Sequence, residues 1–247
     1  MTVNRPAILD ANPFVKFGLS TRLGGVSPPP LGMNLSFHVG DLDANVVKNR
    51  ELFFGSLEIG LADLAIPMQV HSNIVKYADV AGTYPQCDAL VTDVPGVFLC
   101  VSVADCAPIF LLDNKKKVVA AVHAGWRGTA THLVWTTANM MDNVYGCNPK
   151  DIVAYIGPCV SSCCYTVGDD VASRFAPQFL KHDQSRVTLD LKSASISQLT
   201  DLGIPNSQIE VSSHCTICDS HLFHSFRRDR EKSGRMMGVI GLVPGSN

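Results

Sequence analysis

The chain has 247 residues, and its 46% hydrophobic and 17% charged content is typical of a folded globular protein and excludes a disordered one. A formal net charge of −2, with Lys115–Lys117 as the one basic block, argues against nucleic-acid and membrane-surface partners. Met1–Arg5 begins no apolar signal segment and the nine cysteines are an odd number, so we expect reduced thiols in a cytoplasmic protein that does not enter the membrane.

Predicted helices and strands alternate along the chain after a Gly- and Pro-rich loop over Thr21–Pro30. In chain order we expect a helix over Leu42–Leu57, strands over Met68–Val75, Asp88–Asp93, Val97–Val103, Ile109–Leu112 and Val118–Val122, a helix over Gly128–Tyr145, a strand over Ile152–Ile156, helices over Gly168–Leu180 and Leu189–Leu202, and strands over Ile209–Ser212 and Met237–Val243. These elements predict one α/β domain of α+β-like character over residues 1–247, with a mixed β-sheet flanked by helices.

A polar turn between Asp113 and Val118 joins two of the apolar strands, which predicts an antiparallel hairpin. If these two residues pair, Cys106 falls opposite Gly125. Residues two apart on a strand share a face, so Cys106 and His123 would be diagonal neighbours on one side of the sheet. A slip of one residue would place them on opposite faces, and a proline two residues after the cysteine leaves the register open.

His71 is a third candidate ligand upstream of this hairpin. Two imidazoles and one thiolate from His71, Cys106 and His123 would hold Zn²⁺ with a fourth position open, as a catalytic metal requires. Two other interpretations stay open: the histidines are satisfied polar residues, or Cys106 is a nucleophile with His123 as its base and no metal. Copper at the same ligands is a further alternative.

Arg127 lies between Gly125 and Gly128, just where a strand gives way to a helix. Free N–H groups at a helix start and a guanidinium suit an anion, so Arg127 is a candidate for binding phosphate or carboxylate. The alternative is that Arg127 stacks on Trp126 or pairs with a surface acid. A second basic group, Arg227–Arg230, is either a solvated face with an internal acid pair or a further wall of the anion site.

A cluster near the C-terminus also contains possible metal ligands: Cys215, Cys218, His221 and His224. A structural zinc knuckle is one interpretation, but the ligands crowd too short a segment for a Cys₂His₂ finger, so we favour packing and loop chemistry that lines the site. Cys163–Cys164 is too close for an easy disulfide and has no histidine nearby, which predicts buried thiol packing.

The same residues resemble a known family, the laccase-domain proteins, described both as polyphenol oxidases and as zinc-dependent purine nucleoside phosphorylases. The His123–Gly128 element is highly specific, and weaker elements follow in the family's order. The matching elements are Thr21–Ser27, Asn34–Asp41, Gln69–His71, Asp88–Asp93, Ala104–Cys106, Val122–Gly128, Ile156–Pro158, Cys163–Tyr165, Phe226–Asp229 and Gly234–Gly238. The chain departs from the family pattern at Val103, usually Thr, at Cys87, commonly Ala, and at His224, usually another aromatic residue.

The resemblance implies a single-domain fold related to that of a bacterial toxin with a Cys-His pair, and a metal held by His71, Cys106 and His123. It implies phosphorolysis of adenosine, inosine, guanosine and methylthioadenosine to free base and sugar 1-phosphate, and deamination of adenosine to inosine. The partners are then purine nucleosides and phosphate, and we expect a monomer. Copper-dependent polyphenol oxidation is the rival activity, but the eight histidines include no His-x-His pair for a multicopper cluster. A metal-free Cys-His hydrolase is the second rival.

Overall fold

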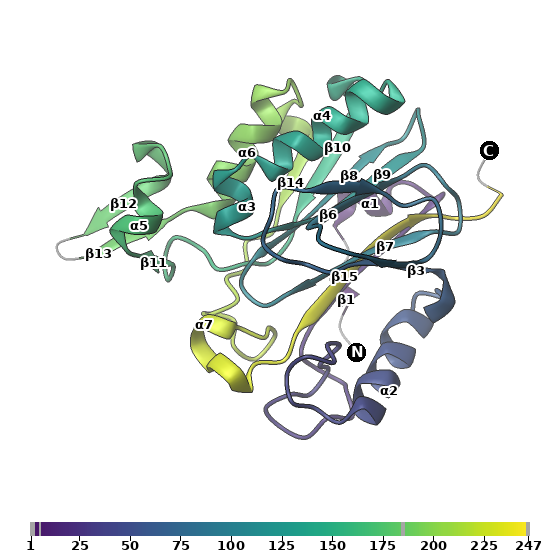
Figure 1. Ribbon diagram of the computed structural model, residues 1–247, viewed down its shortest axis with the longest axis horizontal. Coiled ribbons are helices and arrows are strands. Elements are labelled where there is room, and N and C mark those ends of the chain that lie inside the picture. The colour runs from purple at the N-terminus through teal and green to yellow at the C-terminus, as the bar shows by residue number, and fades with distance from the viewer. Residues whose placement is uncertain (1–2, 5, 184–185, 246–247) are drawn as a thin grey trace.

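Two six-stranded β-sheets face each other in the computed structural model, and helices cover their outer faces (Figure 1). The structure describes residues 3–4, 6–183 and 186–245. The first and last residues of the predicted domain over 1–247 lie outside the described residues. So do Met1, Thr2 and Arg5, where we expected no signal segment. Within the described part, no helix is long and apolar enough to cross a membrane.

Each large sheet mixes parallel and antiparallel pairs. The first has the order β1 (Val3–Asn4), β2 (Val15–Ser20), β15 (Met236–Leu242), β7 (Phe98–Val103), β3 (Leu64–Pro67) and β5 (Gly82–Tyr84). The second has the order β14 (Ile209–Val211), β10 (Ile152–Ile156), β8 (Ala107–Asp113), β9 (Val118–Ala124), β6 (Ala89–Thr92) and β4 (Val75–Tyr77). A small third sheet has the order β11 (Thr166–Val167), β13 (Arg186–Leu189) and β12 (Leu180–Asp183).

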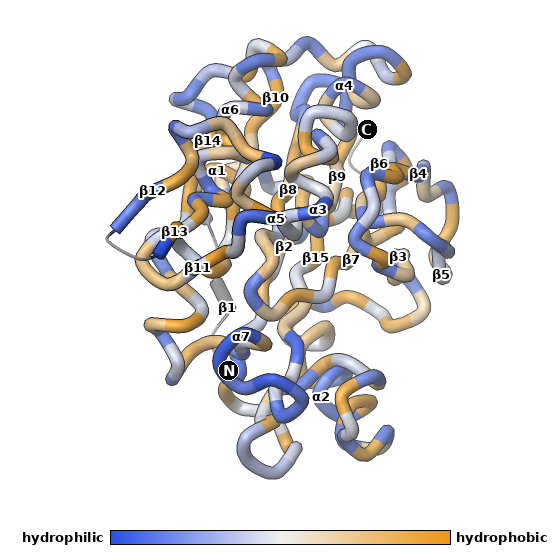
Figure 2. Tube along the Cα trace, turned by 60° about the vertical axis from the view of Figure 1, so that its left-hand side comes forward, coloured by the Kyte–Doolittle hydropathy of each residue, from blue (hydrophilic) through white to orange (hydrophobic). Residues whose placement is uncertain are grey.

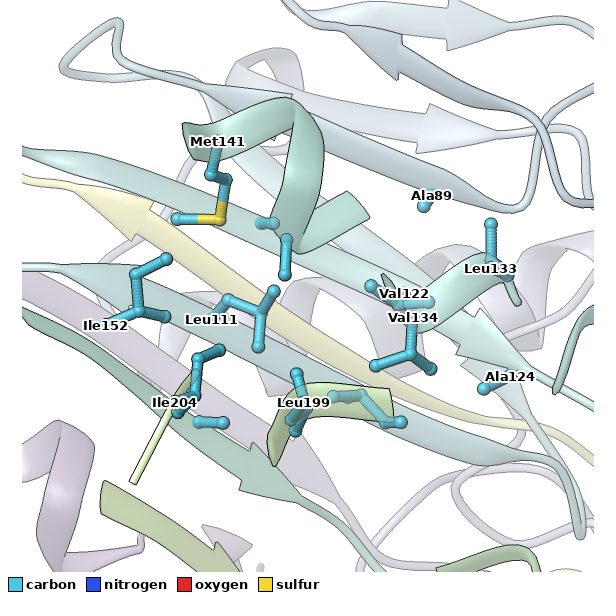
Figure 3. Close-up of a cluster of buried hydrophobic side chains, with 14 of the residues drawn as sticks. Ala89, Leu111, Val122, Ala124, Leu133, Val134, Met141, Ile152, Leu199 and Ile204 are labelled. Carbon is cyan, nitrogen blue, oxygen red and sulfur yellow. The ribbon is translucent and has the colours of Figure 1, made fainter. Parts of the chain in front are cut away.

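The longest helices form the two outer layers. The helices are α1 (Ala7–Asp10), α2 (Asp43–Gly55), α3 (Trp126–Ala130), α4 (Leu133–Tyr145), α5 (Asp169–Ala172), α6 (Leu191–Asp201) and α7 (Phe226–Asp229). Short α1 instead packs against β2 and β10, with Leu9 in the core between the sheets, and α5 packs against β11. Figure 1 shows α2 on one side of the sandwich and α4 with α6 on the other. Apolar residues of α2 pack on β7 and β15, whereas those of α4 and α6 pack on β8, β9 and β10 (Figure 3). The result is a four-layer α–β–β–α arrangement.

The period-two alternation of a strand explains how the central strands serve two cores. In β9, Val118, Ala120 and Val122 face α4 and α6, whereas Val119 and Ala121 face the first sheet. All seven side chains of this strand are buried, so its sequence is almost continuously apolar. The sequence predicted one mixed sheet flanked by helices. The α/β class is confirmed, with two such sheets.

The hairpin register is confirmed, because Asp113 pairs with Val118 and Ala107 pairs with Ala124. Pro108 lies opposite His123 without disturbing this pairing. Its carbonyl accepts a hydrogen bond from the backbone N–H of Gly157, at 2.9 Å, so its polar edge faces β10 and not β9. The missing N–H of the proline therefore removes no bond between the two hairpin strands.

Three predicted elements are wrong or shifted. Residues 68–74 form a loop and not the predicted strand over Met68–Val75. The helix expected over Gly128–Tyr145 starts earlier, at Trp126, and breaks before Leu133, where His132 has a φ of 61°. The helix expected over Gly168–Leu180 is only the four-residue α5, because Pro177 restricts the residue before it to an extended conformation. The remaining predicted helices and strands match observed elements within a few residues.

Candidate metal-binding active site

Three connections that carry the chain from the first sheet to the second meet at one end of the sandwich. They run from β3 to β4, from β5 to β6 and from β7 to β8, and they contain His71, Asp88 and Cys106 in that order. His123 lies near the end of β9. The two-sheet architecture therefore gathers residues from four distant segments at the mouth of the space between the sheets.

Strand alternation aims three of these side chains to the same side. His123 continues the row of Ala121, and Asp88 continues the row of Leu90, both of which belong to the core between the sheets. Cys106 continues the row of Phe110 on the neighbouring strand, which belongs to the same core. At this end of the sandwich, the apolar core between the sheets therefore gives way to a cluster of polar side chains.

The predicted ligands come together. The ligand atoms of His71, Cys106 and His123 all lie within 4.8 Å of one another. The two imidazole rings have centroids 4.9 Å apart and planes inclined by 76°, and the Cys106 thiol hydrogen-bonds to both histidines. His71 is exposed, Cys106 half-buried and His123 buried, so the group opens to solvent on the His71 side.

Asp88 holds this group in place, and we did not predict its role from the sequence. Its carboxylate bonds to Nδ1 of His123 at 2.9 Å and accepts the backbone N–H groups of His71 at 3.0 Å and Ser72 at 2.6 Å. Burial would raise the pKa of Asp88, but the bonds from His123 and Ser72 lower it to about 2. The backbone N–H groups that Asp88 accepts are then not free to pair with a neighbouring strand, which explains why the strand predicted over Met68–Val75 does not form. The same bonds explain why His71 adopts a φ of 59°.

Cys106 and His123 form an ion pair. Burial would raise the pKa of the thiol, but His123 and His71 lower it to about 6. Burial would likewise lower the pKa of His123, but the Cys106 thiolate and the Asp88 carboxylate raise it to about 9. Near neutral pH the metal-free pair is therefore a thiolate beside an imidazolium. A metal ion would displace the proton of His123, because a histidine ligand must be neutral.

Gly125 makes this close approach possible. A Cβ at this position would lie 2.9 Å from Sγ of Cys106 and 3.2 Å from Cδ2 of His71, so any larger residue would push the ligands apart. The backbone of Gly125 is extended, with a φ of −78°. The glycine of the His123–Gly128 element is thus required for space at the ligand group and not for backbone conformation.

The ligand group forms part of the lining of a cavity of about 1010 Å³. Both sheets and the segment around α7 line it. Its aromatic side chains are Phe37, Trp126, Tyr165 and Phe226, and its arginines are Arg50, Arg227, Arg230 and Arg235. Figure 2 shows the mostly hydrophilic α7 that supplies two of these residues. The cavity therefore offers flat apolar surfaces and positive charge next to the candidate metal ligands.

The arginines divide between the cavity and the outer surface. Arg127 is exposed and stacks on Trp126, with its Cζ 4.3 Å from the ring centroid, and it does not line the cavity. This is the stacking alternative considered from the sequence, and an anion-binding role for Arg127 stays a prediction. Arg228 pairs with Asp229 at 2.7 Å, as the internal-pair interpretation expected. Arg227 instead lines the cavity.

The C-terminal cluster is not arranged as the sequence suggested. His224 is buried, and neither of its ring nitrogens has a hydrogen-bond partner. Cys215 and Cys218 instead gather with Cys163–Cys164, so that four sulfur atoms lie within 4.8 Å of one another. The predicted burial of Cys163–Cys164 is wrong, because Cys163 is exposed and Cys164 half-buried. All nine cysteines are free thiols.

Fold and site together define a class of protein: an α–β–β–α sandwich with a His₂Cys group open to a basic and aromatic cavity. The chain belongs to the family described as "Multi-copper polyphenol oxidoreductase laccase", which matches residues 16–243. That family covers the elements from β2 to β15 and so all the site residues. The predicted resemblance to laccase-domain proteins is confirmed.

Similar proteins span nearly the whole chain. It is 38% identical to "Purine nucleoside phosphorylase YlmD" of Geobacillus stearothermophilus, over 91% of this chain and 89% of that protein. It is 30% identical to "Purine nucleoside phosphorylase YfiH" of Escherichia coli, over 91% of this chain and 92% of that protein. The crystal structure of YlmD from Geobacillus stearothermophilus superposes with a TM-score of 0.90 at 34% identity, covering 96% of this chain and 94% of that chain.

Proposed function

We propose that this chain is a purine nucleoside phosphorylase whose active site is built on His71, Cys106 and His123. The observation that carries the proposal is that these ligands open into a cavity lined by both arginine and aromatic side chains. The names of several relatives support the same reaction class. A cavity of about 1010 Å³ has room for a nucleoside and a phosphate together.

Phosphorolysis breaks the bond between C1′ and a purine nitrogen and joins C1′ to a phosphate oxygen. The products are the free base and the sugar 1-phosphate. Arg227, Arg230 and Arg235 bind the phosphate and neutralise its charge, while Phe226 and Trp126 provide flat surfaces on which the purine stacks. Such fixed charges act on the separation of charge as the glycosidic bond breaks, and they need no rearrangement at that moment.

The donor set fits a zinc ion. One thiolate and two imidazoles are ligands that Zn²⁺ prefers, and three protein ligands leave a fourth position open. Asp88 bonds to Nδ1 of His123 and so fixes the ring with its other nitrogen toward Cys106. When bound, the ion supplies a Lewis acid at the floor of the cavity. Copper at these ligands is the alternative metal.

The finer proposal names the substrates and a second reaction. We expect phosphorolysis of adenosine, inosine, guanosine and methylthioadenosine, and deamination of adenosine to inosine at the same site. The test is metal analysis of protein purified without added metal, followed by product analysis with each nucleoside, with and without phosphate. Sugar 1-phosphate should form only with phosphate, whereas inosine should form from adenosine without it. Full turnover in Cys106→Ala, with as much bound zinc as in wild type, would show the proposal to be wrong.

A metal-free Cys-His hydrolase is the second candidate, and one observation favours it. Asp88, His123 and Cys106 form a hydrogen-bonded series that ends in a thiolate, the arrangement of a nucleophilic cysteine and its base. The two functions differ in their response to chelators and thiol reagents. A chelator should abolish the metal-dependent activity and leave a hydrolase active, whereas alkylation should inactivate a metal-free hydrolase without metal removal.

Copper-dependent polyphenol oxidation is the third candidate, which the description of the family suggests. Among the residues that the structure describes, the groups able to hold a metal are one His₂Cys set and one set of four cysteines. Neither has the several histidines that a multicopper cluster needs. Copper-loaded protein that absorbs visible light and consumes oxygen with a phenol would favour this candidate over the phosphorylase.

A further inference from the structure

We infer that Cys163, Cys164, Cys215 and Cys218 form a second metal site, a structural Zn²⁺ site of four thiolates that braces one wall of the cavity. The site is independent of the proposed reaction. The four residues come from two turns that are about fifty residues apart in the chain. Their four sulfur atoms lie within 4.8 Å of one another.

The distances between the sulfur atoms are those of a shared ion. Sγ of Cys163 lies 3.6 Å from Sγ of both Cys164 and Cys218, and Sγ of Cys164 lies 3.3 Å from Sγ of Cys218. A tetrahedron with Zn–S bonds of about 2.3 Å has sulfur atoms about 3.8 Å apart. A disulfide bond is only about 2.0 Å long, so none of these pairs is bonded. The three sulfur atoms of Cys163, Cys164 and Cys218 are thus slightly closer than in a zinc tetrahedron, and Sγ of Cys215 lies within 4.8 Å of each of them. Four thiols gathered in this way are the donor set of a structural zinc site.

The backbone around Cys215 is already arranged for a thiolate. Its sulfur accepts N–H groups from Ile217 and Cys218 within its own Cys-x-x-Cys turn, and from Ser161 in the facing turn. Backbone N–H groups that point at one sulfur stabilise the charged form, which is the form that binds metal. This pattern also fixes the side chain of Cys215 toward the other three sulfurs.

Positive charge lies close to both turns. Four thiolates and one Zn²⁺ carry a net charge of −2, which cations offset. Nζ of Lys181 lies 3.2 Å from Oγ of Ser162, next to the first pair of cysteines. Nη1 of Arg228 donates to the carbonyl oxygens of Thr216 at 2.8 Å and Ile217 at 3.3 Å, between the second pair. Arg228 therefore holds the turn, while Asp229 pairs with its charge.

The two turns lead directly into the wall of the cavity. Val160 and Tyr165 flank the first turn, and Arg227 follows the second; all three line the cavity. A parallel bridge joins Cys159 to Cys215 and already places the segments side by side. An ion held by both turns would lock these segments together, so its loss should loosen the wall without removing the His71, Cys106 and His123 ligands.

The test is a count of zinc per chain in the intact protein. Wild-type protein should hold two zinc ions, Cys218→Ala one and Cys106→Ala one, with none in the double variant. Cys218→Ala should also lower the Tm by about 5 °C. Replacing zinc with Co²⁺ in Cys106→Ala should give the visible absorption of a tetrahedral thiolate site. Cys163→Ser is a second variant that should lose the same ion. Cys147→Ala, whose thiol lies beside Asp113 at the turn end of the hairpin and belongs to neither group, should keep two.

Thiol reactivity provides a readout that does not depend on activity. Cys163 and Cys218 are exposed, so in a metal-free site they should react rapidly with a thiol reagent, whereas zinc should protect them until a chelator is added. The inference is overturned if Cys218→Ala holds as much zinc as wild type, or if the wild-type thiols react at once. It is also overturned if intact mass shows a disulfide between the two turns.

Discussion

The two cysteine-containing clusters of this protein differ in composition, burial and support. The group of His71, Cys106 and His123 mixes nitrogen and sulfur donors, and its inner member is buried and bonded to a carboxylate. The group of four cysteines is all sulfur, lies mostly at the surface and is supported by backbone N–H groups. A three-ligand group open to a cavity suits chemistry, whereas a four-ligand group that joins two turns suits structure.

The difference follows from where each cluster lies in the fold. Strands and sheet-to-sheet connections supply the three-ligand group, so the packed core between the sheets fixes its geometry. Two short turns supply the four cysteines, and Cys164 and Ile217 pack against the small apolar cluster of Val160 and Tyr165. A metal ion is the means by which such turns gain rigidity. The predictions that follow are intended to separate these two roles.

Removal of Cys106 should have the largest effect. Cys106→Ala should lose one zinc ion and reduce phosphorolysis by about a thousandfold or more, because the ligand group is incomplete. Its Tm should fall as well, because a bound ion that stabilises the folded state is lost. The measurements are zinc content, product formation and thermal unfolding of the same preparation. Loss of the ion from the four cysteines in this variant would show that the two groups are not independent.

Asp88→Asn should have the next largest effect. The amide keeps the shape of the carboxylate but removes its charge and its ability to accept every N–H that now points at it. Zinc affinity at the three-ligand group should fall by about 10- to 100-fold, as for other partners of metal-bound histidines. Competition with a coloured chelator measures this change. Asp93→Asn, at the exposed end of the same strand, is the matched control and should keep the wild-type affinity.

His224 lies outside the group of four cysteines and should make the free energy of unfolding depend on pH. Burial, followed by nearby arginines, lowers its pKa in the folded protein to about 3, whereas the unfolded chain has the ordinary value near 6.5. Between these values only the unfolded state takes up the proton, so stability falls as the pH falls below 6.5. The loss by pH 5 is about 2 kcal/mol, roughly thirtyfold in the folding equilibrium.

His224→Phe should remove this pH dependence. The variant and wild type are compared by denaturant unfolding at pH 7.5 and pH 5, where wild type alone should lose the additional stability. His221→Gln, an exposed neighbour, is the control and should behave like wild type. A drop in zinc content of His224→Phe would contradict the structure, which places His224 outside both ligand groups.

Local patterns predicted one of the two clusters and missed the other. The hairpin that joins Cys106 and His123 could be predicted because its register depends on one short turn and on period-two alternation. The role of Asp88 could not, because its partners come from other sheet connections and a single acid before a strand carries no distinctive pattern. The four-cysteine group was missed because each half looks incomplete until the fold brings the turns together.

Sheet assignment failed for a similar reason. The strands of the two sheets follow one another in the chain, so alternation along each strand shows which residues are buried but not which sheet buries them. Helices α2 and α6 were predicted because each is a segment of eleven or more residues with no proline inside it. The small sheet of β11, β12 and β13 was missed, since its strands have only two to four residues and the two predicted helices end at Leu180 and begin at Leu189.

The smallest effect should separate two arginines that the sequence treats alike. Both side chains are exposed, but Arg227 lines the cavity, whereas Arg127 stacks on Trp126 and does not line it. Arg227→Ala should raise the KM for phosphate about tenfold and leave zinc content unchanged, because a charge-assisted contact to the anion is lost. The backbone N–H of Arg227 that donates to Asp105 remains in this variant, so the loop should keep its place.

Arg127→Ala is the matched variant, and its KM for phosphate should stay within about twofold of wild type, because this side chain does not line the cavity. Steady-state kinetics with phosphate varied at saturating nucleoside measures both variants. If instead Arg127→Ala raised the KM for phosphate more than Arg227→Ala, the anion would bind at the start of α3. Arg127 would then have to enter the cavity by a movement about Trp126. Equal effects in both variants would show that a place in the cavity lining does not decide which arginine binds the phosphate.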